Sequence, residues 1–163
     1  MHTIDKKQLV QALRARLEES LARLTASQHA AQTAAVHPES KQEHSKDMRA
    51  TEASYIARGL AERVEVFRDG LRLLELMVVR EFAAGEPAAS GALVTVADGQ
   101  GCQSVYLLAP AGGGERLEVD GHAVLVLTPQ SPLGSVLAGR RATEVVTAEL
   151  PNGRAELEIV RVD

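Results

Sequence analysis

Two acidic residues beside the first proline of the chain could do chemistry together. Glu39 and Glu43 are four residues apart, so on a helix their side chains would lie about 6 Å apart on one face. Two carboxylates so placed could act as a pair, although the positive charge of Lys41 between them would weaken it. The alternative is that both are solvated acids in a first helical turn, where negative charge suits the helix dipole.

The sequence around these acids predicts two long helices. Residues 3–83 contain a single proline, Pro38, and apolar residues recur there every three or four positions. This spacing is typical of a coiled-coil seam. The seam comprises Leu13, Leu17, Leu21 and Leu24, and then Ile56, Leu60, Val64, Phe67, Leu71, Leu74 and Val78.

Proline suits the start of a helix and breaks its interior. We therefore predict helices over Thr3–Val36 and Glu39–Ala83, which a turn at His37–Pro38 makes antiparallel. Alanine replaces leucine toward that turn, so the pair should become slender there. The positions are Ala30, Ala31, Ala34, Ala35 and Ala50.

Charge and composition exclude several classes of function. Residues 84–163 contain 10 acidic residues against five Lys and Arg, and the whole chain has a formal net charge of -4. Neither half has the basic excess of a phosphate-backbone binder, so we expect no direct sequence-specific DNA binding. Cys102 is the single cysteine, which excludes an intramolecular disulfide. No apolar run is long enough to span a bilayer, so a cytoplasmic protein without membrane contact is expected.

The second half has the pattern of short strands separated by turns. Glycine and proline become frequent from residue 84 onward, which predicts a linker over 84–91 between domains 1–83 and 92–163. Alternating apolar residues predict strands over residues 93–96, 104–108, 123–127, 145–150 and 155–160. Pro151-Asn152-Gly153-Arg154 predicts a hairpin between the last two. We expect an α+β protein with an antiparallel sheet.

One short helix is predicted in this half. Ser131 is the expected N-cap, Pro132 the first helical residue and Gly139 the residue that ends the helix.

The C-terminal sequence resembles the Gre family of bacterial transcript-cleavage factors. The similarity is most specific where a strand leads into Ser131-Pro132-Leu133-Gly134 and a small-residue helix. A Glu-Val-Val strand, a Pro-Asn-Gly turn and a Glu-Leu-Glu-Ile strand follow in the family's order. With the helical hairpin included, the resemblance covers nearly the whole chain. It implies an FKBP-like fold for the second domain.

The resemblance also implies a mechanism and a partner. The C-terminal domain would bind the rim of the RNA polymerase secondary channel through Ser131, Pro132, Leu133 and Gly134. The hairpin tip would enter the channel and contact the transcript RNA indirectly. The chain would have no cofactor of its own, because acidic tip residues would share an Mg²⁺ in the polymerase active site to promote the polymerase's own RNA cleavage.

The tip departs from the family pattern. Aligned on Glu52 and Gly59, Glu43 falls on the family's glutamate, but Ser40 falls on its aspartate. Glu39, Ser40 and Glu43 are therefore the candidate catalytic residues, with Glu39 and Glu43 as the candidate metal ligands.

Three alternatives stay open. The altered tip favours a regulator that occupies the channel without stimulating cleavage. The helices alone would suit a coiled-coil scaffold. An FKBP-like domain could also be a peptidyl-prolyl isomerase, although Tyr106 is the only aromatic residue that residues 92–163 offer to line such a pocket.

Overall fold

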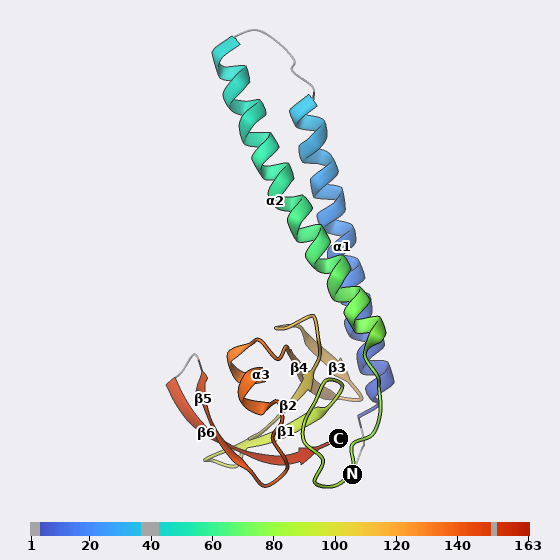
Figure 1. Cartoon of the computed structure of the whole chain (residues 1–163), viewed down its shortest axis with the longest axis vertical. Coiled ribbons are helices and arrows are strands. Elements are labelled where there is room, and N and C mark those ends of the chain that lie inside the picture. Colours follow the sequence, from blue (N-terminus) through green and yellow to red (C-terminus); the bar gives the residue numbers. More distant parts are fainter. Residues whose placement is uncertain (1–3, 37–42, 151–152) are drawn as a thin grey trace. The chain divides into compact units, whose positions relative to one another are not determined.

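The computed structural model describes residues 4–36, 43–150 and 153–163. In chain order, the described residues form two long helices, four strands, a short helix and two further strands (Figure 1). The predicted α+β class is confirmed. The contacts divide the chain into two compact units, one of residues 15–71 and one of residues 1–14 with 72–163. None of the described helices is long and apolar enough to cross a membrane.

The two long helices are antiparallel, as predicted (Figure 1). Helix α1 spans Lys6–Val36 and α2 spans Glu43–Leu76. At 1.5 Å per residue, they are about 46 and 51 Å long. The predicted turn at His37–Pro38 lies outside the described residues.

The first helix begins three residues later than predicted because Asp5 caps it. The Asp5 carboxylate accepts hydrogen bonds from the backbone N–H groups of Lys7 and Gln8, at 2.8 and 3.2 Å. An acceptor of this kind satisfies N–H groups that have no partner within the helix. Helix α1 therefore starts at Lys6 rather than at Thr3.

Within residues 15–71, the helices bury a seam of alternating three- and four-residue steps. Leu17 of α1 and Val64 of α2 are 4% and 1% exposed. Ile56 is 52% exposed, so its predicted place in the seam is wrong. Ala57, one residue later, is partly buried and precedes Leu60 and Val64 at the correct spacing.

The second helix ends at Leu76, not at Ala83 as predicted. Residues 77–83 form neither helix nor strand, and Phe82 is 9% exposed because it joins the hydrophobic core of the sheet. Val78, the last predicted seam residue, is 67% exposed. Burying an aromatic ring is worth more than continuing an exposed helical turn.

Six strands form one sheet in the order β3-β4-β2-β1-β6-β5. Strands β2 and β4 are parallel and the other neighbours are antiparallel, so the sheet is mixed rather than wholly antiparallel. The bounds are β1 Leu93–Asp98, β2 Gln103–Leu108, β3 Arg116–Val119, β4 His122–Leu127, β5 Val145–Leu150 and β6 Gly153–Val162.

Strand β3 was not predicted. It has four residues and pairs with β4 across the two-residue turn Asp120-Gly121, where both residues have positive φ. This is the geometry that a two-residue hairpin turn requires. The signal for this strand in the sequence was the pair Asp120-Gly121 directly after the alternating apolar residues Leu117 and Val119.

The short helix α3, Pro132–Leu137, covers one face of the sheet. Leu133 and Leu137 join a core with residues from β1, β4, β5 and β6. The strand before α3 and the hairpin after it thus hold this helix in a fixed place on the sheet.

Candidate functional site

The predicted tip lies mostly outside the described residues. Glu39 and Ser40 are not described, and Glu43 is described only as the first residue of α2. Their catalytic and metal-binding roles stay predictions. Among the residues that the structure describes, no cluster of three or more His, Cys, Asp or Glu side chains could hold a metal ion.

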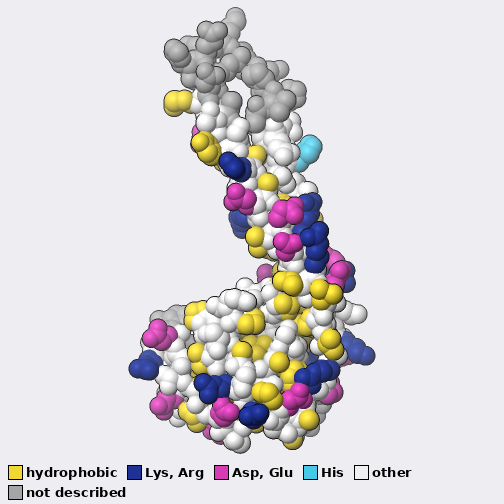
Figure 2. Space-filling view, viewed as in Figure 1, with side chains coloured by type: hydrophobic (Ala, Val, Ile, Leu, Met, Phe, Trp, Pro, Cys, Tyr) yellow, Lys and Arg dark blue, Asp and Glu magenta, His cyan; other side chains and the backbone are white. Residues whose placement is uncertain are grey.

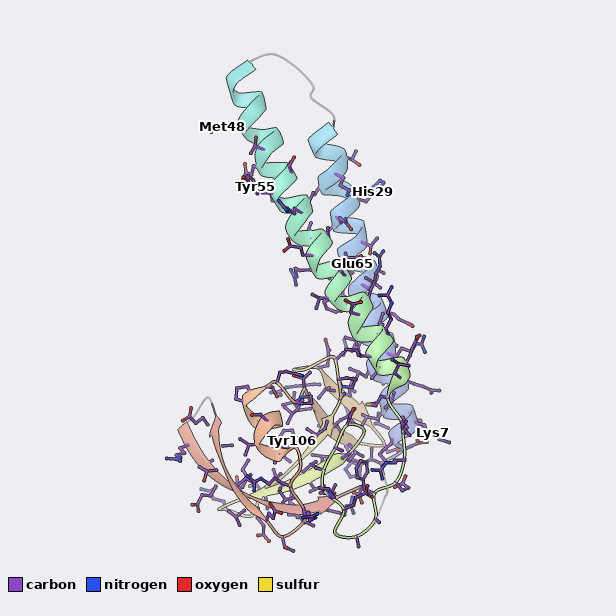
Figure 3. The ribbon with its side chains drawn as sticks, viewed as in Figure 1. Lys7, His29, Met48, Tyr55, Glu65 and Tyr106 are labelled. Carbon is purple, nitrogen blue, oxygen red and sulfur yellow. The ribbon has the colours of Figure 1, made fainter. Side chains whose placement is uncertain are left out.

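The described part of α2 nearest the tip has an exposed apolar face. Met48 is 75% exposed and Tyr55 is 70% exposed. They are seven residues apart, and Figure 3 shows both on the side of α2 that points away from α1. Glu52 lies between them on the same face. This face is available to a partner, because the seam with α1 uses the opposite side.

Charges along the helical pair do not form a block of one sign. Figure 2 shows acidic and basic side chains interspersed there on the face in view. Several belong to local pairs, such as Arg23 with Glu19 at 3.0 Å and Arg68 with Glu65 at 2.5 Å. A phosphate backbone would find no basic stripe on this face.

The predicted docking motif begins with a capped turn. Ser131 has extended backbone angles, and its hydroxyl accepts a hydrogen bond from the Gly134 N–H at 3.1 Å. The same hydroxyl donates to the Thr128 carbonyl at 2.7 Å. Pro132 occupies the first turn of the helix, where its missing N–H costs nothing. The expected cap and helix start are both confirmed.

Gly134 is required by a close approach rather than by an unusual backbone angle. A Cβ atom at this position would lie 2.0 Å from the Thr128 carbonyl oxygen and 2.7 Å from the Ser131 hydroxyl. Any side chain would therefore open the capped turn. The tetrapeptide is a rigid unit whose conformation depends on the serine at its start and the glycine at its end.

The structure separates the four predicted docking residues by exposure. Pro132 is exposed, whereas Leu133 is 8% exposed and Gly134 is buried. Leu133 belongs to the core of the sheet. A partner at this motif would therefore touch Pro132, which its exposed neighbours Gln130 and Ser135 flank.

A cluster that the sequence reasoning missed fixes the segment after α2 to the start of α1. We call Lys6, Arg80, Phe82 and Glu86 the clasp. The Lys6 ammonium donates to the Arg80 carbonyl and lies 5.3 Å from the centre of the Phe82 ring. The Arg80 guanidinium lies 4.0 Å from the same ring centre.

Glu86 completes the clasp. Both of its carboxylate oxygens accept hydrogen bonds from Arg80, and one also accepts from the Ala83 N–H at 3.0 Å. The Arg80 hydrogen bonds, with the Ala83 N–H second, lower the pKa of Glu86 to about 2. The signal for this cluster in the sequence was the spacing of three residues: Phe82 follows Arg80 by two positions and precedes Glu86 by four.

A pocket with a volume of about 530 Å³ lies over β2, β3 and β4. Its lining includes Tyr106, labelled in Figure 3, with Arg116 and His122. Tyr106 is the one aromatic residue among the described residues that line it, and it packs against the core cluster. This lining does not favour the isomerase hypothesis, which needs an aromatic pocket.

No protein-family model matches the sequence, and no curated protein matches it significantly.

Solved structures do resemble it. One is the "GreA factor homolog 1 (Gfh1) protein of Thermus thermophilus", at 20% identity over 93% of this chain and 95% of that one, with a TM-score of 0.40. Another is described as the transcription factor Gfh1, at 21% identity over 93% of each chain and a TM-score of 0.42. A third is a transcription elongation factor GreA/GreB from Nitrosomonas europaea, at 14% identity over 69% of this chain and 91% of that one, with a TM-score of 0.37. These three solved structures are thus described as Gfh1 and GreA/GreB transcription factors.

Proposed function

We propose that this chain is an accessory transcription elongation factor that binds bacterial RNA polymerase at the rim of its secondary channel. The observation that supports this most is the order of structural elements around Ser131–Gly134. Strand β4, the capped turn Ser131–Gly134, helix α3 and the β5–β6 hairpin follow in the order that the sequence resemblance implies. Each residue of the tetrapeptide has a physical reason for its place.

Pro132 is the proposed contact with the polymerase, and the other three residues position it. Ser131 and Gly134 hold the turn through the N–H to hydroxyl hydrogen bond, and Leu133 anchors it to the core. A rigid, exposed proline loses little entropy on binding, so it suits a small docking surface.

The antiparallel helices are the proposed means of reaching the polymerase active site. Among the side chains that the structure describes near the tip, Ala31 and Ala53 are partly buried, where leucine and valine stand farther along the seam. Small seam residues make a slender pair, which favours entry into a narrow channel. Carboxylates at Glu39 and Glu43 would then approach an Mg²⁺ that the polymerase holds. The hydrolysis would be the polymerase's own reaction, and the chain would not be an enzyme.

A second version is a regulator that occupies the channel without stimulating cleavage. Ser40 favours it, because the resemblance implies an aspartate there and a hydroxyl is a poor substitute for a carboxylate ligand. Cleavage of backtracked RNA in a single round distinguishes the two versions. Stimulation by the wild type and its loss in Glu43→Gln would support the cleavage factor, and tight binding without stimulation would support the regulator.

Co-purification with core bacterial RNA polymerase tests the proposal. Pro132→Glu should weaken binding about ten-fold or more, because it places a charge at the centre of the contact while an acid at a helix start is tolerated. Gln100→Glu, which adds the same charge in an exposed turn, is the matched control and should bind as the wild type does. Failure of the wild type to co-purify would contradict the proposal, and an obligate dimer joined through the helices would favour the scaffold alternative.

A further inference from the structure

Strand β5 is an open edge of the sheet. It stands last in the strand order and pairs with β6 alone (Figure 1). In an antiparallel pair, every second residue of an edge strand points its N–H and C=O groups away from the neighbouring strand. Three of the six residues of β5 therefore present unpaired backbone groups outward. Among the described residues, no backbone group bonds to this side of Val145–Glu149.

This edge lacks the features that usually protect one. Natural edge strands are short, or carry Lys, Pro or a bulge, since an open edge recruits other chains. Val145–Glu149 contains no Lys, Pro or bulge, its single charged residue is Glu149 at the end of the segment, and Val145 is 62% exposed. The opposite edge, β3, has four residues and carries Arg116, and its following turn lies near Asp5 of the N-terminal segment.

The charge beside the edge indicates what kind of chain would add to it. On the solvent face, Val145 and Thr147 pair with Glu158 and Glu156 of β6, and Glu149 pairs with Arg154. Three carboxylates against one guanidinium make this face acidic. An added strand lies about 4.8 Å from the edge, where its side chains would meet Val145, Thr147 and Glu149.

We infer that β5 binds an extended, basic peptide segment of a partner protein, which adds to the sheet as a seventh strand. Backbone hydrogen bonds to β5 provide the attachment. Because side chains alternate between faces, the basic ones lie on the face of Glu149, Glu156 and Glu158, and the apolar ones lie on the opposite face, beside Val146 and Ala148. The site is on a different element from Pro132, so the inference does not depend on the proposed polymerase contact.

The probe is a capped synthetic peptide of about eight residues with alternating valine and lysine, a usual strand length. Titration followed by fluorescence anisotropy should show saturable binding. The matching valine–glutamate peptide should bind about ten-fold more weakly or worse, because like charges across a strand pair repel. Equal binding of the two peptides, or no binding of the lysine peptide, overturns the inference.

Two lysine substitutions locate the site. Val145→Lys places a positive charge on the edge and should reduce binding of the lysine peptide about ten-fold. Val66→Lys is the matched control, because Val66 is 69% exposed on helix α2, and it should leave binding unchanged. Equal loss in both variants, or no loss in Val145→Lys, contradicts a site on β5.

Two further measurements cover folding and self-association. If Val145→Lys does not fold, the amide chemical shifts of the wild-type protein are followed while the lysine peptide is added. Changes confined to β5 and its neighbours support the site, and changes elsewhere overturn it. Sedimentation of the wild type alone tests the other occupant. A dimer that Val145→Lys abolishes would mean that a second copy, not a basic peptide, fills the edge.

Discussion

Gly134 shows how one neighbouring atom can dictate a residue type. The backbone angle there is ordinary, but the Thr128 carbonyl occupies the place that a side chain would need. The sequence predicted the cap and the helix start, since Ser and Pro have known roles at those positions. It could not predict this contact, because the strand end that supplies the carbonyl is placed by the sheet.

We predict that Gly134→Ala destabilises the protein by about 1–3 kcal/mol, because the added methyl forces the capped turn apart. Gly99→Ala is the control: nothing lies within 4 Å of a Cβ there and φ is not positive. Urea denaturation of the two variants measures the difference. Equal stability would show that the turn relaxes freely and is not a rigid docking unit.

The clasp makes stability depend on pH through Glu86. Its folded pKa of about 2 is below the ordinary value of 4.5. The folded state therefore gains stability from the ionised carboxylate above pH 4.5, and this gain is lost as the pH falls toward 2. Protonation of Glu86 removes the ion pair with Arg80.

Glu86→Gln should accordingly reduce the dependence of the unfolding midpoint on pH between 4.5 and 2. Arg80→Gln should reduce it to a smaller extent, because the Ala83 N–H still lowers the pKa of Glu86. The double variant should match Glu86→Gln, because both changes break one pair. Urea midpoints measured across this range provide the comparison. A wild-type acid response in Glu86→Gln would contradict the assigned pair.

The helices show which features of an element can be predicted from spacing. The three- and four-residue steps identified Leu17, Leu60 and Val64 correctly as seam residues. They placed Ile56 in the seam wrongly, because a bulky apolar residue is a stronger signal of burial than the small Ala57 beside it. The local spacing could not predict the end of α2 either, because that end depends on the packing of Phe82 in the core of the sheet.

Two valines of α2 test the observed seam. Val64 is 1% exposed and Val66 is 69% exposed, so the same substitution probes opposite faces of one helix. Val64→Ala should cost about 2 kcal/mol through lost burial and a residual cavity, whereas Val66→Ala should change stability little. Thermal unfolding monitored by circular dichroism measures both. Equal losses would mean that the helices do not pack through the Val64 face.

At the scale of the whole molecule, charge and fold class were predictable and the candidate tip was not. The uneven charge was read directly from the sequence, and so was the change from helices to strands near residue 84. The proposed roles of Glu39, Ser40 and Glu43 would depend on a partner's active site, and Glu39 and Ser40 lie outside the described residues. No spacing within one chain can reveal geometry that two proteins build together.

The central claim is that the tip of the helical pair enters the polymerase channel, and a tethered iron chelate tests it most directly. Cys102 is exposed and is the single cysteine, so Cys102→Ser provides a background for one new attachment site. Met48→Cys, on the exposed face of α2 toward the tip, carries the chelate, and Gln100→Cys in the sheet domain is the control.

With a backtracked polymerase complex, hydroxyl radicals from the Met48→Cys conjugate should cut the transcript near its 3′ end and the polymerase near its active centre. The Gln100→Cys conjugate should cut neither. Cutting by the Met48→Cys conjugate only on the outer surface of the polymerase, or the same pattern from both conjugates, would contradict entry into the channel.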